Sequence, residues 1–112
     1  MARIAGTLSS FTPKEVKELF AKASALSKNP IFTLLIAPKS KEHGRILLVA
    51  SRRVGSAPER NLLKRRTRAL FYEEKLFERG YDCIIIFKKG AADLDFHELK
   101  KMILEAFSKV RQ

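Results

Sequence analysis

The sequence predicts a single-domain α+β fold, an α/β sandwich whose elements follow in the order helix, strands, helix, strand, helix. Three observations predict it. The length of 112 residues suffices for one domain with one modest core. Three capping-box patterns each precede an amphipathic stretch and mark helix starts. Short, nearly all-apolar runs between these stretches are typical of strands. Because no repeat or linker divides the chain, we expect residues 1–112 to form one domain.

The N-terminal part begins with an aperiodic segment, residues 1–10, which we expect to be loose. Thr12 and Glu15 then have the spacing of a capping box, which predicts a helix over 13–24. The apolar stripe of this helix consists of Val16, Leu19, Phe20 and Ala23. Since amphipathic stripes usually pack against a core, we expect this stripe to do so, and a functional role is the alternative.

The predicted strands are short runs of apolar residues. Residues 31–37 and 45–51 flank a turn over 38–44, so we expect them to form an antiparallel pair. Both runs lack polar alternation, which is typical of strands that are covered on both faces. Residues 82–88 form a third strand after Gly80.

A basic helix follows the second strand. Ser56 and Glu59 form its capping box, and we expect the helix to run to about Phe77. At about 100° per residue, one side of this helix packs and the other is cationic. The packing side carries Leu63, Thr67, Leu70 and Phe77, and the other carries Arg60, Asn61, Lys64, Arg65, Arg68 and Lys75.

The tract from Ser51 to Phe71 has the densest charge in the chain, with seven cations and the single acid Glu59. Like charges four residues apart on a helix repel one another and destabilise it. A bound polyanion would offset that cost. A merely solvated helix face is the alternative, but such faces usually mix both signs of charge.

The last helix begins at the capping box of Asp95 and Glu98. Apolar residues recur at spacings of three and four along it, which describes one buried face. These residues are Phe96, Leu99, Met102, Ile103, Ala106, Phe107 and Val110.

The net charge of +11 and the pI of about 10.2 favour nucleic acid as the partner. An anionic membrane surface is the competing polyanion. No apolar run approaches the roughly 20 residues that a membrane span needs, and the N-terminus lacks the apolar core of a signal peptide. We therefore expect a cytoplasmic protein with no membrane partner.

The chain itself offers little for catalysis. Cys83 is the single cysteine and lies in an apolar run, so we expect a buried structural thiol and no disulfide-linked partner. His43 and His97 have no partner at a metal-ligand spacing, and no catalytic or phosphate-binding motif is present. A self-sufficient nuclease would need clustered carboxylates or histidines to hold metal ions. We assign no catalytic residue and no metal-binding side-chain cluster.

The tract S-R-R-V-G-S-A-P-E-R-N-L-L-K-R-R-T-R (51–68), followed by G-Y-D-C-I-I-I-F-K-K-G-A (80–91), resembles the protein subunit of bacterial ribonuclease P. The resemblance covers about residues 11–110. It implies a four-stranded sheet with the basic helix in a left-handed crossover between parallel strands, although right-handed crossovers are the rule. It also implies the function: the family's protein binds a catalytic RNA and the 5′ leader of precursor tRNA, while the RNA, with Mg²⁺, hydrolyses the phosphodiester.

The resemblance also implies which residues bind the catalytic RNA. They are Arg52, Arg53, Arg60, Asn61, Lys64, Arg65 and Arg68, called the basic face below. Arginine suits this role because its fork donates two parallel hydrogen bonds to a phosphate. In this family Asn61 lies near bound metal; an ordinary exposed helix residue is the alternative.

The family binds the leader in a cleft between the first helix and the sheet. The resemblance places Val16, Phe20, Phe32, Leu34 and Phe107 there. Aromatic rings stack on unpaired bases for about 1–3 kcal/mol each. A shift of one residue in strand register would exchange Phe32 and Leu34 for their neighbours.

Two residues depart from the family's pattern. Leu62 stands where the family's Arg-Asn-Arg triplet has its last arginine, and Arg66 stands where relatives carry an apolar residue, so its stem is expected to snorkel outward. The alternative from another class is a small structural RNA-binding protein of ribosomal type, which would share the charge and the size. The order of the basic tract before the G-Y-D strand favours the ribonuclease P protein.

Overall fold

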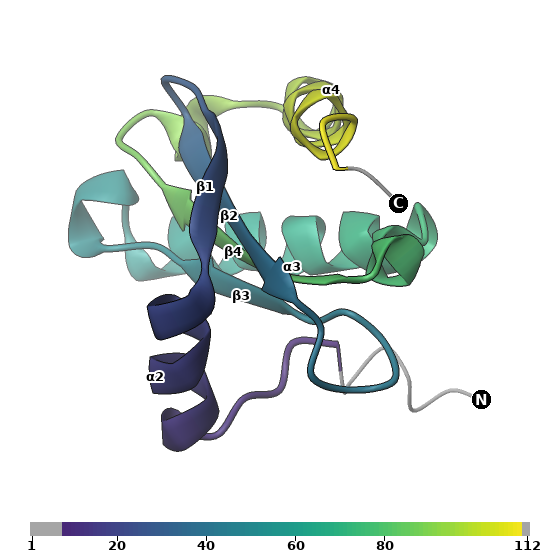
Figure 1. Cartoon of the computed structure of the whole chain (residues 1–112). Coiled ribbons are helices and arrows are strands. Elements are labelled where there is room, and N and C mark those ends of the chain that lie inside the picture. Colours follow the sequence, from purple (N-terminus) through teal and green to yellow (C-terminus); the bar gives the residue numbers. More distant parts are fainter. Residues whose placement is uncertain (1–7, 111–112) are drawn as a thin grey trace.

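The structure, a computed structural model, describes residues 8–110 and confirms the α+β fold. Its helices are α2 (Pro13–Lys22), α3 (Ala57–Glu73) and α4 (Phe96–Phe107), and its strands are β1 (Ser24–Lys28), β2 (Phe32–Pro38), β3 (Ile46–Val49) and β4 (Tyr81–Phe87). Short 3₁₀ turns are η1 (Arg52–Val54), η2 (Leu76–Arg79) and η3 (Ala91–Asp93). Helix α2 leads directly into β1 and stands apart from α3 and α4 (Figure 1).

The four strands form one mixed sheet in the order β1-β2-β4-β3. Strand β4 pairs antiparallel with β2 and parallel with β3. The expected antiparallel pair between residues 31–37 and 45–51 is therefore wrong, because β4 lies between these two strands. Ile84 and Ile85 of β4 are fully buried on opposite faces, as suits a central strand. The parallel strands β3 and β4 are joined through α3, and the left-handed sense of this crossover stays a prediction.

The resemblance implied a fourth strand but did not place it, and the first helix was expected to run through residue 24, where β1 begins. The β1 sequence S-A-L-S-K pairs antiparallel with β2, with a register shift between Ala25 and Ser27. It is an edge strand, and only Ser27 of its five residues is buried. Such a short and mostly polar segment carries no apolar run from which a strand could be predicted.

All three predicted capping boxes are present. In each box, the side chain of the first residue accepts a hydrogen bond from the backbone N–H of a glutamate three residues later. The carboxylate of that glutamate accepts from the backbone N–H of the first residue. The pairs are Thr12–Glu15, Ser56–Glu59 and Asp95–Glu98. Helix α3 ends at Glu73, four residues before the expected end at Phe77. Lys75 adopts a left-handed conformation (φ 55°), and η2 then turns Leu76 and Phe77 into the core.

Residues 1–7 of the segment expected to be loose lie outside the described residues. Leu8 is 3 % exposed, and its carbonyl accepts a 2.7 Å hydrogen bond from the N–H of Ile46. Leu8 therefore packs as part of the core and pairs with the start of β3.

The two faces of the sheet bury two separate clusters. The larger cluster contains Phe32, Leu34 and Ile85 and packs against α3 and α4. The smaller one contains Leu19 of α2, Ala37 and Ile84. Alternate residues of β2 and β4 thus face opposite ways, and α2 covers only part of its face.

Candidate nucleic-acid interface

The basic face extends from η1 along the outer side of α3. Arg52, Arg53, Asn61, Arg65 and Arg68 are exposed, whereas Arg60 and Lys64 are half-buried. The opposite side of α3 buries Leu63, Thr67, Leu70 and Phe71. The Thr67 hydroxyl donates a 2.8 Å hydrogen bond to the Leu63 carbonyl, so this packing side leaves no polar group of Thr67 unpaired. The predicted division of this helix into a core side and a cationic side is therefore present.

The positive charge of this face is not neutralised by the protein. None of its cationic side chains forms an ion pair or a hydrogen bond with another residue in the range 8–110. Glu59, the one acid of the tract, is held at the helix start, where its Oε1 accepts from the Ser56 N–H at 2.8 Å. Hydrogen bonds from the Ser56 backbone and hydroxyl lower the pKa of Glu59, which keeps it ionised in the capping box. The arginines thus remain available to phosphates.

The two departures from the family's pattern lie side by side. Leu62 and Arg66 are one helical turn apart, both half-buried, and both line a small hollow with residues of η3 and α4. Arg66 thus lies along the boundary between the core side and the basic face, as its expected snorkelling requires.

An open apolar surface lies on the sheet beside α2. The half-buried residues Leu35, Leu47, Val49 and Ile86 form it, and we call it the apolar sheet surface. The register places Thr33, Ile86 and Val49 in one row and Ala37 and Asp82 in a row nearer the other end of the strands. Helix α2 packs Leu19 on Ala37 and Ile84, so the row through Ile86 is left half-open.

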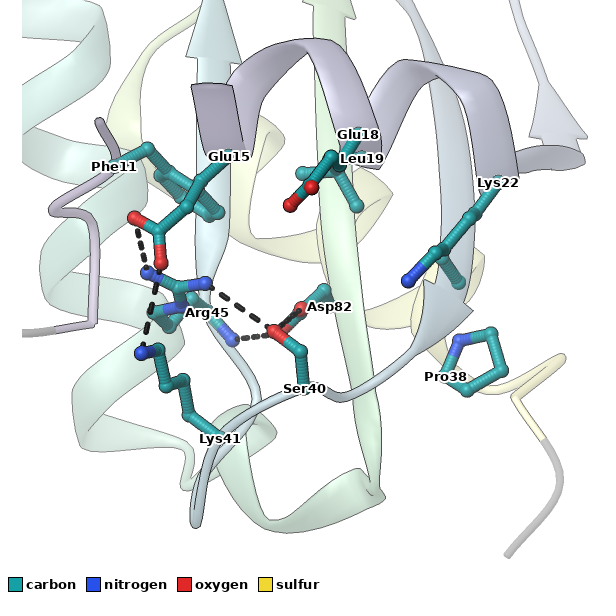
Figure 2. Close-up of a pocket in the computed structure, with 11 residues that line it drawn as sticks. Phe11, Glu15, Glu18, Leu19, Lys22, Pro38, Ser40, Lys41, Arg45 and Asp82 are labelled. Carbon is teal, nitrogen blue, oxygen red and sulfur yellow. Dashed lines mark hydrogen bonds and ion pairs between the residues drawn. The ribbon is translucent and has the colours of Figure 1, made fainter. Parts of the chain in front are cut away.

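The two flanks of α2 face opposite ends of the sheet. Glu15, Glu18 and Lys22 line a pocket of about 200 Å³ with Ala37, Pro38, Ser40, Lys41, Arg45 and Asp82 (Figure 2). At 100° per residue, Val16 and Phe20 lie on the other flank of the helix, toward the apolar sheet surface. Phe20 is 43 % exposed and Val16 is half-buried. We infer that these two residues border the apolar sheet surface, because the pocket lies on the opposite flank of α2.

Three of the predicted cleft residues lie elsewhere. Phe32 and Leu34 are 0 % exposed and Phe107 is 1 % exposed, all within the large cluster on the face opposite α2. These three side chains therefore do not line a cleft with α2. Phe32 and Leu34 face the other way because the register of β2 differs by one residue from the expected one, and Phe107 belongs to α4, which covers that opposite face. Leu35 is the β2 residue that belongs to the apolar sheet surface. The run I-F-T-L-L-I-A has no alternation from which its two faces could have been told apart.

The remaining candidates for chemistry are few. Cys83 is buried, and burial raises the pKa of its thiol, so it is an unreactive core residue. Within residues 8–110, no three His, Cys, Asp or Glu side chains gather where they could hold a metal ion. Among the helices of residues 8–110, none has the length and hydrophobicity that a transmembrane span requires.

An α+β domain whose arginine-rich helix face forms no ion pair within residues 8–110 is typical of the class of small RNA-binding proteins. The ribonuclease P family model matches residues 11–111. The ribonuclease P protein component of Stutzerimonas stutzeri is 32 % identical over 100 residues, which are 88 % of this chain and 76 % of that protein. That of Citrifermentans bemidjiense is 35 % identical over 81 residues, which are 72 % of this chain and 70 % of that protein.

Solved structures agree with the fold. The RNase P protein of Staphylococcus aureus superposes with a TM-score of 0.79 at 20 % identity, covering 94 % of this chain and 98 % of that one. The RNase P protein of Thermotoga maritima gives a TM-score of 0.77 at 22 % identity, covering 93 % and 98 %. The chain belongs to the bacterial ribonuclease P protein family. It is thus the protein subunit of an RNA-based endoribonuclease that takes part in tRNA processing.

Proposed function

We propose that the basic face binds the catalytic RNA and that the apolar sheet surface, with Val16 and Phe20, binds the single-stranded 5′ leader of precursor tRNA. The protein then assists the removal of the leader, which leaves the mature 5′ end. The observation that carries this proposal is the unpaired charge of the basic face on a fold shared with the family.

The basic face suits a structured RNA because its cations are spread over η1 and more than two turns of α3. Arg52 and Arg53 offer two exposed guanidinium forks beside the helix start, each able to hold a phosphate through two parallel hydrogen bonds. Asn61 adds an exposed amide, which both donates and accepts and so can bind a base edge or a metal-bound water.

The hydrolysis itself is assigned to the RNA. Mg²⁺ prefers carboxylate and phosphate oxygens, and the described residues of this chain do not bring together a carboxylate cluster that fits it. We therefore propose that the RNA phosphates hold Mg²⁺, with Asn61 at most beside it. No side chain of this protein is given a catalytic role, and its contribution is to bind and orient two RNAs.

The apolar sheet surface suits an unpaired strand of RNA. The leader lacks base pairs, so its bases can lie against Phe20 and the half-buried Leu35 and Ile86. Val49, which pairs with Ile86, ends β3, and Arg52 and Arg53 follow it in η1. The phosphates of the leader would thus lie near these arginines where the RNA leaves the apolar sheet surface. We place this activity in the cytoplasm, with no membrane involved.

The test is reconstitution of the whole enzyme. The full-length protein is mixed with the catalytic RNA of its own organism and a precursor tRNA at a Mg²⁺ concentration too low for the RNA alone. We expect cleavage of the precursor well above that of the RNA alone. If the protein leaves the rate unchanged, the proposed function fails. Tight binding to ribosomal RNA, measured in a parallel binding experiment, would then support the ribosomal alternative.

A further inference from the structure

We propose that Arg45 is a positioning residue that fixes α2 over the sheet and thereby sets how well the enzyme distinguishes precursor from mature tRNA. The inference rests on the proposed leader site. Arg45 touches no part of that site; it acts through α2, which carries Val16 and Phe20. Figure 2 shows Glu15 pointing from α2 onto the Arg45 guanidinium, with Ser40 and Asp82 beyond it.

Helix α2 has a weak apolar attachment. It is 10 residues long, and Leu19 is its only buried residue. Most helices in proteins are held by a whole buried stripe. The placement of α2 therefore depends on further contacts, and those of its first turn involve Arg45.

Arg45 is fixed to the sheet through its backbone. Its N–H donates to Asp82 Oδ1 at 2.9 Å, and its carbonyl accepts from the Cys83 N–H at 2.8 Å. Asp82 is itself buried on β4, and its Oδ2 accepts a hydrogen bond from the Ser40 hydroxyl at 3.4 Å. The base of the Arg45 side chain is thus immobilised on the central strand of the sheet.

The guanidinium of Arg45 then holds the chain that leads into α2. Nη1 donates to the Ser10 carbonyl at 2.8 Å and to Glu15 Oε1 at 3.3 Å. The Arg45 Cζ lies 4.3 Å from the centre of the Phe11 ring, a cation–π distance. Glu15 Oε1 also accepts from the Thr12 N–H at 2.9 Å, so the same oxygen belongs to the capping box. One side chain therefore ties the strand segment, the cap and the first turn of α2 together.

Stability alone does not explain this arginine. Its side chain is 9 % exposed, and its Nε–H has no hydrogen-bond partner within residues 8–110. A buried donor without a partner is destabilising, and apolar residues of similar volume often replace buried ionic groups without loss of stability. What an apolar residue cannot do is hold Glu15 and Ser10 at fixed angles. A helix rises about 1.5 Å per residue, so Phe20 lies roughly 7.5 Å beyond Glu15 and follows any tilt of the first turn.

The test compares Arg45→Met with Phe20→Leu in the assembled enzyme. The measured quantities are the affinity for the catalytic RNA and the ratio of precursor to mature tRNA affinity. We expect Arg45→Met to keep its RNA affinity and to lose roughly fivefold or more in the ratio, the size of one weakened base-stacking contact. Hydrogen exchange of the α2 amides should become faster, whereas that of β4 should stay slow. Arg45→Lys keeps the positive charge but lacks the guanidinium fork, so it should lower the ratio of precursor to mature tRNA affinity by less than Arg45→Met does.

Two further variants separate positioning from folding. Lys41 also pairs with Glu15, at 3.6 Å, but is 59 % exposed and holds no other part of α2, so Lys41→Met should leave the ratio unchanged. Glu15→Gln keeps an oxygen for the cap and removes the ion pair, and it should lower the ratio without unfolding the domain even if Arg45→Met folds poorly.

The outcomes are distinct. If Phe20→Leu lowers the ratio while Arg45→Met and Glu15→Gln fold and leave both the ratio and the α2 exchange rates unchanged, the positioning role is overturned. If Phe20→Leu itself has no effect, the proposed leader site fails and the inference fails with it.

Discussion

Gly55 and Glu59 are in such close approach at the start of α3 that a Cβ on Gly55 would lie 2.7 Å from Glu59 Oε1. That oxygen accepts the hydrogen bond from the Ser56 N–H at 2.8 Å and completes the capping box. A glycine before the cap therefore leaves room for the carboxylate that begins the basic helix.

We expect Gly55→Ala to displace the Glu59 carboxylate and lower the free energy of unfolding by up to about 1 kcal/mol, the usual size of a lost cap. In a Glu59→Ala background the same substitution should cost little further, because the oxygen that it meets is gone. Urea unfolding of the two single variants and the double variant measures this coupling. Additive losses would show that the close approach has no energetic consequence.

The two capping carboxylates of α2 and α3 predict how stability changes in acid. The Thr12 backbone N–H and the Arg45 guanidinium lower the pKa of Glu15 from 4.5 to about 2, and hydrogen bonds from Ser56 lower that of Glu59. A carboxylate with a lowered folded-state pKa stabilises the fold above its unfolded pKa, and the stabilisation is lost as the pH falls through the folded pKa. The contribution of Glu15 should therefore be complete above pH 4.5 and disappear between about 4.5 and 2.

Urea midpoints measured from pH 6 to pH 2 should fall across this window in the wild type. Glu15→Gln removes the titrating group, so its midpoints should fall less steeply while its stability at low pH approaches that of the wild type. An unchanged slope in Glu15→Gln would mean that other groups account for the acid sensitivity.

The basic face predicts a change in the salt dependence of binding. Arg65 is exposed, and its side chain forms no hydrogen bond or ion pair within residues 8–110, so Arg65→Ala should weaken binding to the catalytic RNA without unfolding the domain. When one phosphate contact is lost, binding releases about one counterion fewer. The fall of log affinity with log salt concentration should therefore become shallower, by about 1 in slope. The matched control is Lys101→Ala, an exposed cation of α4 outside the basic face. Equal slopes for Arg65→Ala and the wild type would remove Arg65 from the interface.

The helices and the basic face could be predicted because their signals are local. A capping box needs only residues three apart, as with Ser56 and Glu59, and a cationic side follows from the helical period. Membership of the family then added the number of strands and the RNA partner.

The pairing of strands could not be predicted, because it depends on residues far apart in the sequence. Strand β4 enters the sheet between β2 and β3 although it follows them in the chain. The prediction of which β2 residues lie on each face was wrong for another reason. Leu34 and Leu35 are chemically alike in an all-apolar run, yet Leu34 is buried under α3 and α4 and Leu35 lies on the apolar sheet surface. Arg45 carried no signal either, since nothing local marks it as buried.

The last prediction tests the leader site through Phe20 and its neighbour Val16. Phe20→Leu keeps apolar volume but removes the flat ring, and since Phe20 is 43 % exposed, the domain should lose little stability. Precursor affinity should fall more than mature tRNA affinity, because only the precursor carries a leader. The matched control is Phe32→Leu, the same exchange at a ring that is 0 % exposed on the other face; it should lower stability and leave the affinity ratio unchanged.

Val16→Phe should add a stacking ring and tighten precursor binding by up to about 1–3 kcal/mol. Should Phe20→Leu and Val16→Phe both leave the ratio of precursor to mature affinity at its wild-type value, the exposed stripe of α2 serves packing only.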